Sequence, residues 1–86
     1  MTEHHHTRDK LTNVLPERLK AARNAAELTL MGMAQRAGLS SPTMVADYES
    51  GRRTPGAKHL AAMAHELGVS TDWLLGLSDS VQGAAF

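Results

Sequence analysis

Residues 28–49, LTLMGMAQRAGLSSPTMVADYE, decide the fold of this 86-residue chain. Apolar residues recur at helical spacing over residues 30–37, which predicts a first short helix. Gly38 follows directly, where a glycine commonly ends a helix. Pro42 suits the first turn of a helix, so a second helix is expected over residues 42–49. The stretch therefore predicts two short helices joined by a tight turn, the arrangement called a helix-turn-helix.

The turn between these helices allows two interpretations. If Ser41 is the N-cap, the turn gains one residue and Val45 takes the buried position. If Ser40 is the N-cap instead, Met44 is buried and the helix must bulge. Pro42 favours the first interpretation, because proline is common just after an N-cap. The outward residues of the helix are then Pro42, Thr43, Met44, Ala46 and Asp47.

Three more amphipathic helices flank this stretch. Leucines and alanines recur at spacings of three and four over residues 15–26, which predicts the first of them. A second is expected over residues 57–67, ending before Gly68, and a short third runs to Leu75. No strand-like alternation occurs in the sequence. The predicted fold class is therefore all-α, a compact five-helix bundle.

The chain divides into one domain and two terminal segments. We expect the folded domain over residues 15–76, a flexible N-terminal arm over residues 1–14 and a frayed C-terminal tail over residues 77–86. The tail is a candidate dimer contact or the start of a linker. Its apolar residues are Leu77, Val81 and Phe86.

Composition limits the possible functions. The formal net charge is zero, so any attraction for nucleic acid must come from a local basic patch. The absence of cysteine excludes disulfides and thiolate metal sites. No apolar run approaches the roughly 18 residues of a membrane span, and the N-terminus lacks a secretory signal. We therefore expect a soluble, cytoplasmic protein.

Four segments, in order, carry a family resemblance. Together they resemble the phage repressor/Cro (Xre-like) family of helix-turn-helix transcriptional regulators. The resemblance implies a lambda-repressor-like fold whose second and third helices bind a double-stranded DNA operator, with a homodimer as the working unit. The segments are RLKAAR at residues 18–23, LTLMGMAQRAGLS at 28–40, YESGRRTP at 48–55 and HLAAMAHELGVSTDWLLG at 59–76.

The resemblance also implies a structural ion pair between Arg23 and Glu49. An Arg fork can meet a carboxylate through two parallel hydrogen bonds, which would fix the first helix against the end of the third. The alternative is two separate solvated charges. Because burial of charges offsets their attraction, we expect the pair to orient the helices more than to stabilise them.

The helix over residues 42–49 has few side chains suited to reading bases. Arg, Lys, Asn and Gln make the bidentate pairs that discriminate bases in the major groove, and none lies between Pro42 and Asp47. Thr43 can form one hydrogen bond, and its methyl group or that of Ala46 can pack on a thymine methyl. The candidate DNA-contacting residues around this helix are Ser41, Pro42, Thr43, Met44, Ala46 and Asp47.

The sequence has more side chains suited to contacting the DNA backbone than to reading bases. Arg52 and Arg53 follow the second helix of the motif, and Lys58 lies near the start of the next helix. Arg and Lys side chains and helix N-termini commonly bind phosphates. Arg36 could add a further phosphate contact. The alternative for each is a solvated surface charge.

The N-terminal arm carries two further candidate groups. His4, His5 and His6 are adjacent without a rigid frame, so a purification remnant or a solvated tail is favoured over a metal site. Arg8 and Lys10 could enter a minor groove, although acidic neighbours dilute their charge.

Two functions from different classes follow. The first is a sequence-specific DNA-binding transcriptional regulator, a repressor, with residues 42–49 in the major groove and the Arg52–Arg53 loop on phosphates. The alternative is a protein-interaction module of the same fold that has lost base reading. It would present an apolar patch made of Leu30, Met31, Pro42, Met44 and their neighbours. We expect no enzyme, no catalytic residues, no cofactor and no metal.

Overall fold

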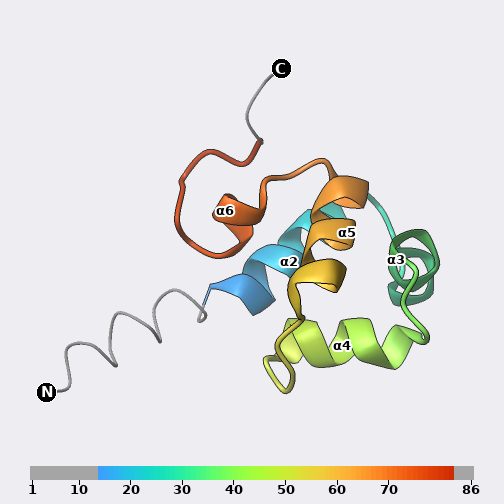
Figure 1. Cartoon of the computed structure of the whole chain (residues 1–86). Helices are drawn as coiled ribbons and strands as arrows, with labels where there is room; N and C mark the ends of the chain where they lie inside the picture. Colours follow the sequence, from blue (N-terminus) through green and yellow to red (C-terminus); the bar gives the residue numbers. More distant parts are fainter. Residues whose placement is uncertain (1–13, 83–86) are drawn as a thin grey trace, which may run out of the picture.

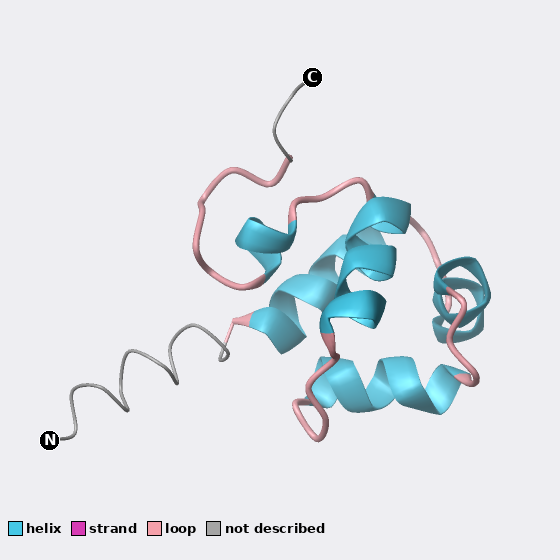
Figure 2. Cartoon of the chain, viewed as in Figure 1, coloured by secondary structure: helices cyan, strands magenta, loops and turns pink. Residues whose placement is uncertain are grey.

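The computed structural model describes residues 14–82, which form five α-helices joined by short loops. Figures 1 and 2 show a bundle without strands in this part of the chain. The all-α prediction is confirmed, and each helix begins where the sequence pattern placed it. The helices are α2 (Leu15–Ala25), α3 (Leu30–Ala37), α4 (Pro42–Ser50), α5 (Ala57–Leu67) and α6 (Thr71–Leu74).

The helices pack around α2 and α5, which lie in the middle of the molecule (Figure 1). Contacts join α3 to α4 and α5, α2 to α4 and α6, and α5 to α6. One cluster of buried apolar side chains connects them all. Its residues with no measurable exposure are Leu19, Met33, Val45, Met63 and Leu74.

The turn between α3 and α4 follows the first of the two interpretations. Gly38 has φ 74°, a left-handed conformation that glycine adopts without a side-chain clash. The Ser41 hydroxyl accepts a hydrogen bond from the Met44 N–H at 3.3 Å, so Ser41 is the N-cap. Val45 is fully buried, and the extra residue lies in the turn.

The position of the Met44 side chain differs from that interpretation. Its side chain does not point outward but is half-buried and packs against the core cluster. Its sulfur lies 2.9 Å from the Ser40 hydroxyl oxygen. A flexible thioether can fill the gap beside the turn, which removes much of its surface from solvent.

The end of α2 has an unusual residue in its turn. Glu27 has φ 60° and is the one non-glycine residue with positive φ in the described chain. Its N–H donates to the Asn24 carbonyl at 2.9 Å, and the Leu28 N–H donates to the Arg23 carbonyl at 3.2 Å. This pair of hydrogen bonds is a Schellman motif, in which glycine normally takes the place of Glu27.

Residues 77–82 form a strap that folds back over α6. The Ser70 N–H donates to the Val81 carbonyl at 2.7 Å. The Arg18 guanidinium donates to the Trp73 carbonyl at 2.6 Å and to the Ser78 carbonyl at 3.2 Å, and it lies 4.9 Å from the centre of the Trp73 ring. The expectation of a frayed end is therefore wrong for residues 77–82.

Some predictions concern residues outside the described part of the chain. These include the three histidines and the two cations of the N-terminal arm, and Phe86 of the tail. Val14, the last residue of the predicted arm, directly precedes α2. Among residues 14–82, no group of His, Asp and Glu side chains is arranged to hold a metal ion. No helix of this part is long and apolar enough to cross a membrane.

Candidate nucleic-acid interface

Helix α4 presents a mainly apolar surface beside its core-facing side. Thr43 is exposed near its start, whereas Pro42, Ala46 and Asp47 are half-buried. Val45 and Tyr48 point into the core. Sequence reasoning placed Pro42, Thr43, Ala46 and Asp47 correctly outside the core, with Thr43 the most accessible.

The polar groups of α4 mostly bind one another. The Ser50 hydroxyl donates to the Asp47 carbonyl at 3.1 Å and accepts from the Arg52 N–H at 3.3 Å. The Asp47 carboxylate lies 3.8 Å from Nε of Arg52. The hydroxyls of Ser41 and Ser50 are therefore engaged within the protein, whereas the Asp47 carboxylate has only the long contact to Arg52.

The loop after α4 is the basic part of this surface. The Arg52 side chain is 77% exposed, and Arg53 and Lys58 are exposed as well. The N-terminus of α5 begins at Gly56, which offers no side chain to bind the first N–H groups of the helix. Unpartnered N–H groups and the helix dipole favour an anion at this position. The structure thus brings Arg52, Arg53 and Lys58 to one end of α4.

Arg23 and Glu49 form the expected ion pair. Nε of Arg23 donates to Oε2 of Glu49 at 2.6 Å and Nη2 donates to Oε1 at 3.0 Å, so the contact is bidentate. Nη1 donates to the Leu28 carbonyl at 2.7 Å. The hydrogen bond to Glu49 raises the pKa of Arg23, with burial opposing and the carboxylate charge adding to the rise. The pair connects α2, the loop before α3 and the end of α4.

A second polar contact that holds α4 was not predicted. The Tyr48 hydroxyl lies 2.9 Å from Nδ1 of His59, which connects α4 to α5. No local pattern reveals the contact, because the two residues stand 11 positions apart on different helices.

The start of α3 offers little to a phosphate. Thr29 caps the helix by accepting from the Gly32 N–H at 2.9 Å. Leu30 is half-buried and Met31 is 51% exposed, so the next side chains are apolar. Arg36 is exposed near the other end of α3, close in sequence to the turn.

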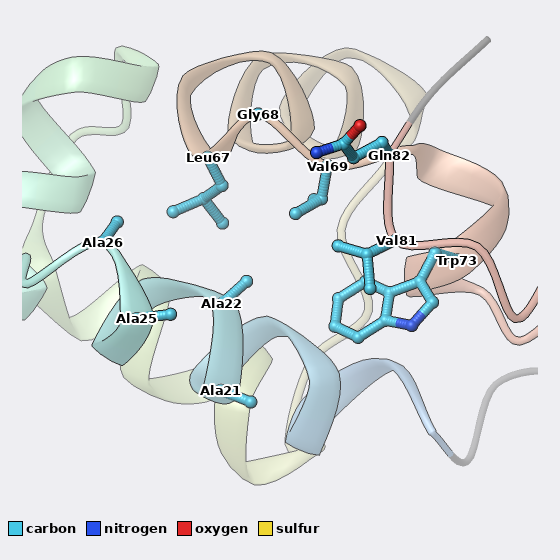
Figure 3. Close-up of a pocket in the computed structure, with 10 residues that line it drawn as sticks. All are labelled: Ala21, Ala22, Ala25, Ala26, Leu67, Gly68, Val69, Trp73, Val81 and Gln82. Carbon is cyan, nitrogen blue, oxygen red and sulfur yellow. The ribbon is translucent and has the colours of Figure 1, made fainter.

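An apolar groove of about 430 Å³ lies apart from this surface. Figure 3 shows its alanine side, Ala21, Ala25 and Ala26, facing Leu67 and Val69. Trp73 and Val81 form another wall, and none of the lining residues belongs to α3 or α4. The groove therefore does not contribute to the surface around α4.

A family model described as helix-turn-helix matches residues 19–74, more than half of the chain. No curated protein sequence matches significantly. The fold is similar to that in the crystal structure of the P22 c2 repressor protein in complex with synthetic operator 9T in the presence of Tl+. That similarity has a TM-score of 0.71 and 23% identity, over 76% of this chain and 97% of that chain.

At this identity the structural similarity establishes the fold, and the family match extends from within α2 to the end of α6. The family match confirms the resemblance to helix-turn-helix regulators, and the structural similarity confirms the expected fold. The chain belongs to the helix-turn-helix family.

Proposed function

We propose that the protein is a sequence-specific DNA-binding transcriptional regulator that inserts α4 into the major groove. The supporting observation is the combination of an accessible α4 with three exposed cations at its end. A helix of this kind enters the groove with its N-terminal residues toward the bases. Thr43 then lies nearest to the base edges.

The loop after α4 supplies the attraction that the neutral chain lacks overall. Arg52, Arg53 and Lys58 bind backbone phosphates, together with the N-terminus of α5. Arg36 adds a contact from α3. Because Asp47 lies near Arg52, one carboxylate lowers the local positive charge. We therefore expect modest affinity for a single half-site.

A homodimer would overcome the modest affinity of one domain. Two half-sites about 34 Å apart, one helical turn, would let both copies bind at once. Leu77 and Val81 remain exposed on the strap, at 58% and 43%, and are the proposed dimer contact. Repression follows if the occupied operator overlaps a promoter, and the proposed site of action is the cytoplasm.

Titration with salt tests this function. The protein is added to a fluorescently labelled random-sequence duplex, and anisotropy is followed as the salt concentration rises. Four phosphate contacts predict a slope of log affinity against log salt of about −3.6. No binding at low salt by a folded protein would reject the function.

The protein-interaction module remains the second candidate, because Met31 is 51% exposed beside Leu30. An apolar pair at the start of a helix suits a protein partner better than a phosphate. Replacing Met31 with Gln separates the two functions. It weakens partner binding under this alternative, whereas DNA affinity stays the same or improves under the first.

A further inference from the structure

The accessible surface of α4 offers mostly C–H groups to a ligand. Within α4 the exposed residues are Thr43 and Ser50. The Ser50 hydroxyl is used twice inside the protein, and Asp47 is drawn to Arg52. This leaves Thr43 as the accessible residue of α4 whose hydroxyl takes part in no hydrogen bond within residues 14–82.

Thr43 has two chemically different ends. Its hydroxyl both donates and accepts hydrogen bonds, so it can pair with a carbonyl or with an amino group on a base edge. Its methyl group forms no hydrogen bonds and packs only on apolar surface. One turn further along the helix, the half-buried Ala46 adds a second methyl group.

The pyrimidines differ at two positions of the major-groove edge. Thymine presents an acceptor, O4, beside a methyl group on C5, whereas cytosine presents an amino donor and no methyl group. A protein group that can only accept, or can only donate, a hydrogen bond would distinguish thymine O4 from the cytosine amino group. A threonine hydroxyl satisfies either, so the C5 methyl group is the difference that remains.

Apart from two carboxylates, Asp47 near Arg52 and Glu49 bound to Arg23, α4 has no side chain of the kinds that read the polar position. No Arg, Lys, Asn or Gln occurs in residues 41–51. Arg52 and Arg53 follow the helix, and Gln35 and Arg36 precede it on α3. These residues are exposed but lie outside α4, whereas Thr43 is exposed on α4 itself.

We propose that α4 reads the C5 methyl group of pyrimidines and accepts thymine and 5-methylcytosine alike. This inference rests on the proposed function, since it assumes that α4 enters the major groove of DNA. Discrimination then comes from burial of a methyl group against Thr43 and Ala46. Methylation of cytosine in a suitable sequence would create a binding site.

The test uses duplexes selected from a random-sequence pool by the whole 86-residue protein. The enriched duplex is synthesised again with deoxyuridine replacing thymidine, one position at a time. At the sensitive positions it is also made with 5-methylcytosine or cytosine, paired with guanine. At each sensitive position we expect uracil to weaken binding about fourfold, the effect of exposing one methyl group. Thymine and 5-methylcytosine should differ by less than that.

Two substitutions of the exposed Thr43 test whether its methyl group causes the preference for thymine over uracil. Thr43→Ser keeps the hydroxyl and removes the methyl group, so the ratio of thymine to uracil affinity should fall toward one. Thr43→Val keeps the methyl group and replaces the hydroxyl with a second methyl group, so the ratio should persist or rise. Thermal unfolding followed by circular dichroism shows that both variants remain folded.

The outcomes separate this inference from the proposed function. Equal affinity for thymine and uracil duplexes overturns the inference and leaves DNA binding intact. So does a preference for thymine over 5-methylcytosine that exceeds the preference for thymine over uracil. An unchanged ratio in Thr43→Ser removes Thr43 from the role. Failure to bind any duplex overturns the proposed function and the inference together.

Discussion

Two arginine–carboxylate pairs lie at the same end of α4, and they differ in distance, hydrogen bonding and exposure to solvent. Arg23 and Glu49 meet through two hydrogen bonds, with side chains only 11% and 7% exposed. Arg52 and Asp47 stand 3.8 Å apart, with side chains 77% and 20% exposed. The first pair holds α4 in place, and the second leaves a cation accessible to a ligand.

The difference shows why charge type alone does not assign a role. Water screens the exposed pair, so its attraction contributes less than about 1 kcal/mol and a phosphate can replace Asp47 as the partner of Arg52. Little water reaches Arg23, so loss of Glu49 would leave its charge with the Leu28 carbonyl as its remaining partner. The first arginine therefore serves the fold and the second is available for binding.

The largest expected effect is on the Arg23–Glu49 pair, which is largely shielded from solvent. Glu49→Ala should lower the free energy of unfolding by about 3 kcal/mol, because it leaves the Arg23 guanidinium in a poorly solvated site. Urea unfolding followed by circular dichroism measures the change. The double variant Arg23→Met with Glu49→Leu should recover most of the loss. If Glu49→Ala lowered the free energy of unfolding by less than about 1 kcal/mol, the pair would contribute no more than an exposed surface ion pair.

The exposed cations should affect binding and not folding. Arg52→Ala with Arg53→Ala should weaken binding to all duplexes alike by at least about tenfold, because a hydrogen bond to a charged group contributes about 1.5 kcal/mol. The slope of log affinity against log salt should become shallower by about two. The matched variant with lysine at both positions should retain the slope. A sequence-dependent loss would instead indicate base contacts.

The smallest effect concerns the turn that Arg23 holds through the Leu28 carbonyl. Glu27→Gly should raise the free energy of unfolding by up to about 1 kcal/mol, because it relieves the left-handed conformation of Glu27. The ion pair should be unchanged, so DNA affinity should stay the same. Thermal unfolding measures the gain in stability. Glu27→Ala is the control, because alanine also has a Cβ atom and its positive φ stays strained. Equal melting temperatures for the two variants would contradict this reason.

Most of the fold was accessible to sequence reasoning because its signals are local. Thr29 and Ser41 cap α3 and α4 as predicted, and Gly38 adopts the left-handed conformation expected after α3. The Arg23–Glu49 pair came from the family resemblance together with the geometry of an arginine fork. The assignment of DNA contacts to Thr43 and the loop cations stays a prediction.

Contacts between distant residues were beyond that reasoning. The hydrogen bonds from Arg18 to the Trp73 and Ser78 carbonyls, across 55 and 60 positions, were not predicted. The Tyr48–His59 hydrogen bond and the half-buried position of Met44 were missed for the same reason. Each depends on where another helix arrives, which no local spacing encodes.

The sequence by itself determined the helices, their caps and the order of the helix-turn-helix, because propensity, capping and apolar spacing act within a few residues. Only the tertiary structure decided which charges are free. Packing buried Arg23 against Glu49, drew Asp47 toward Arg52 and folded residues 77–82 over α6. The same side chain can support the fold or bind a ligand, and solvent access, which packing sets, makes the difference.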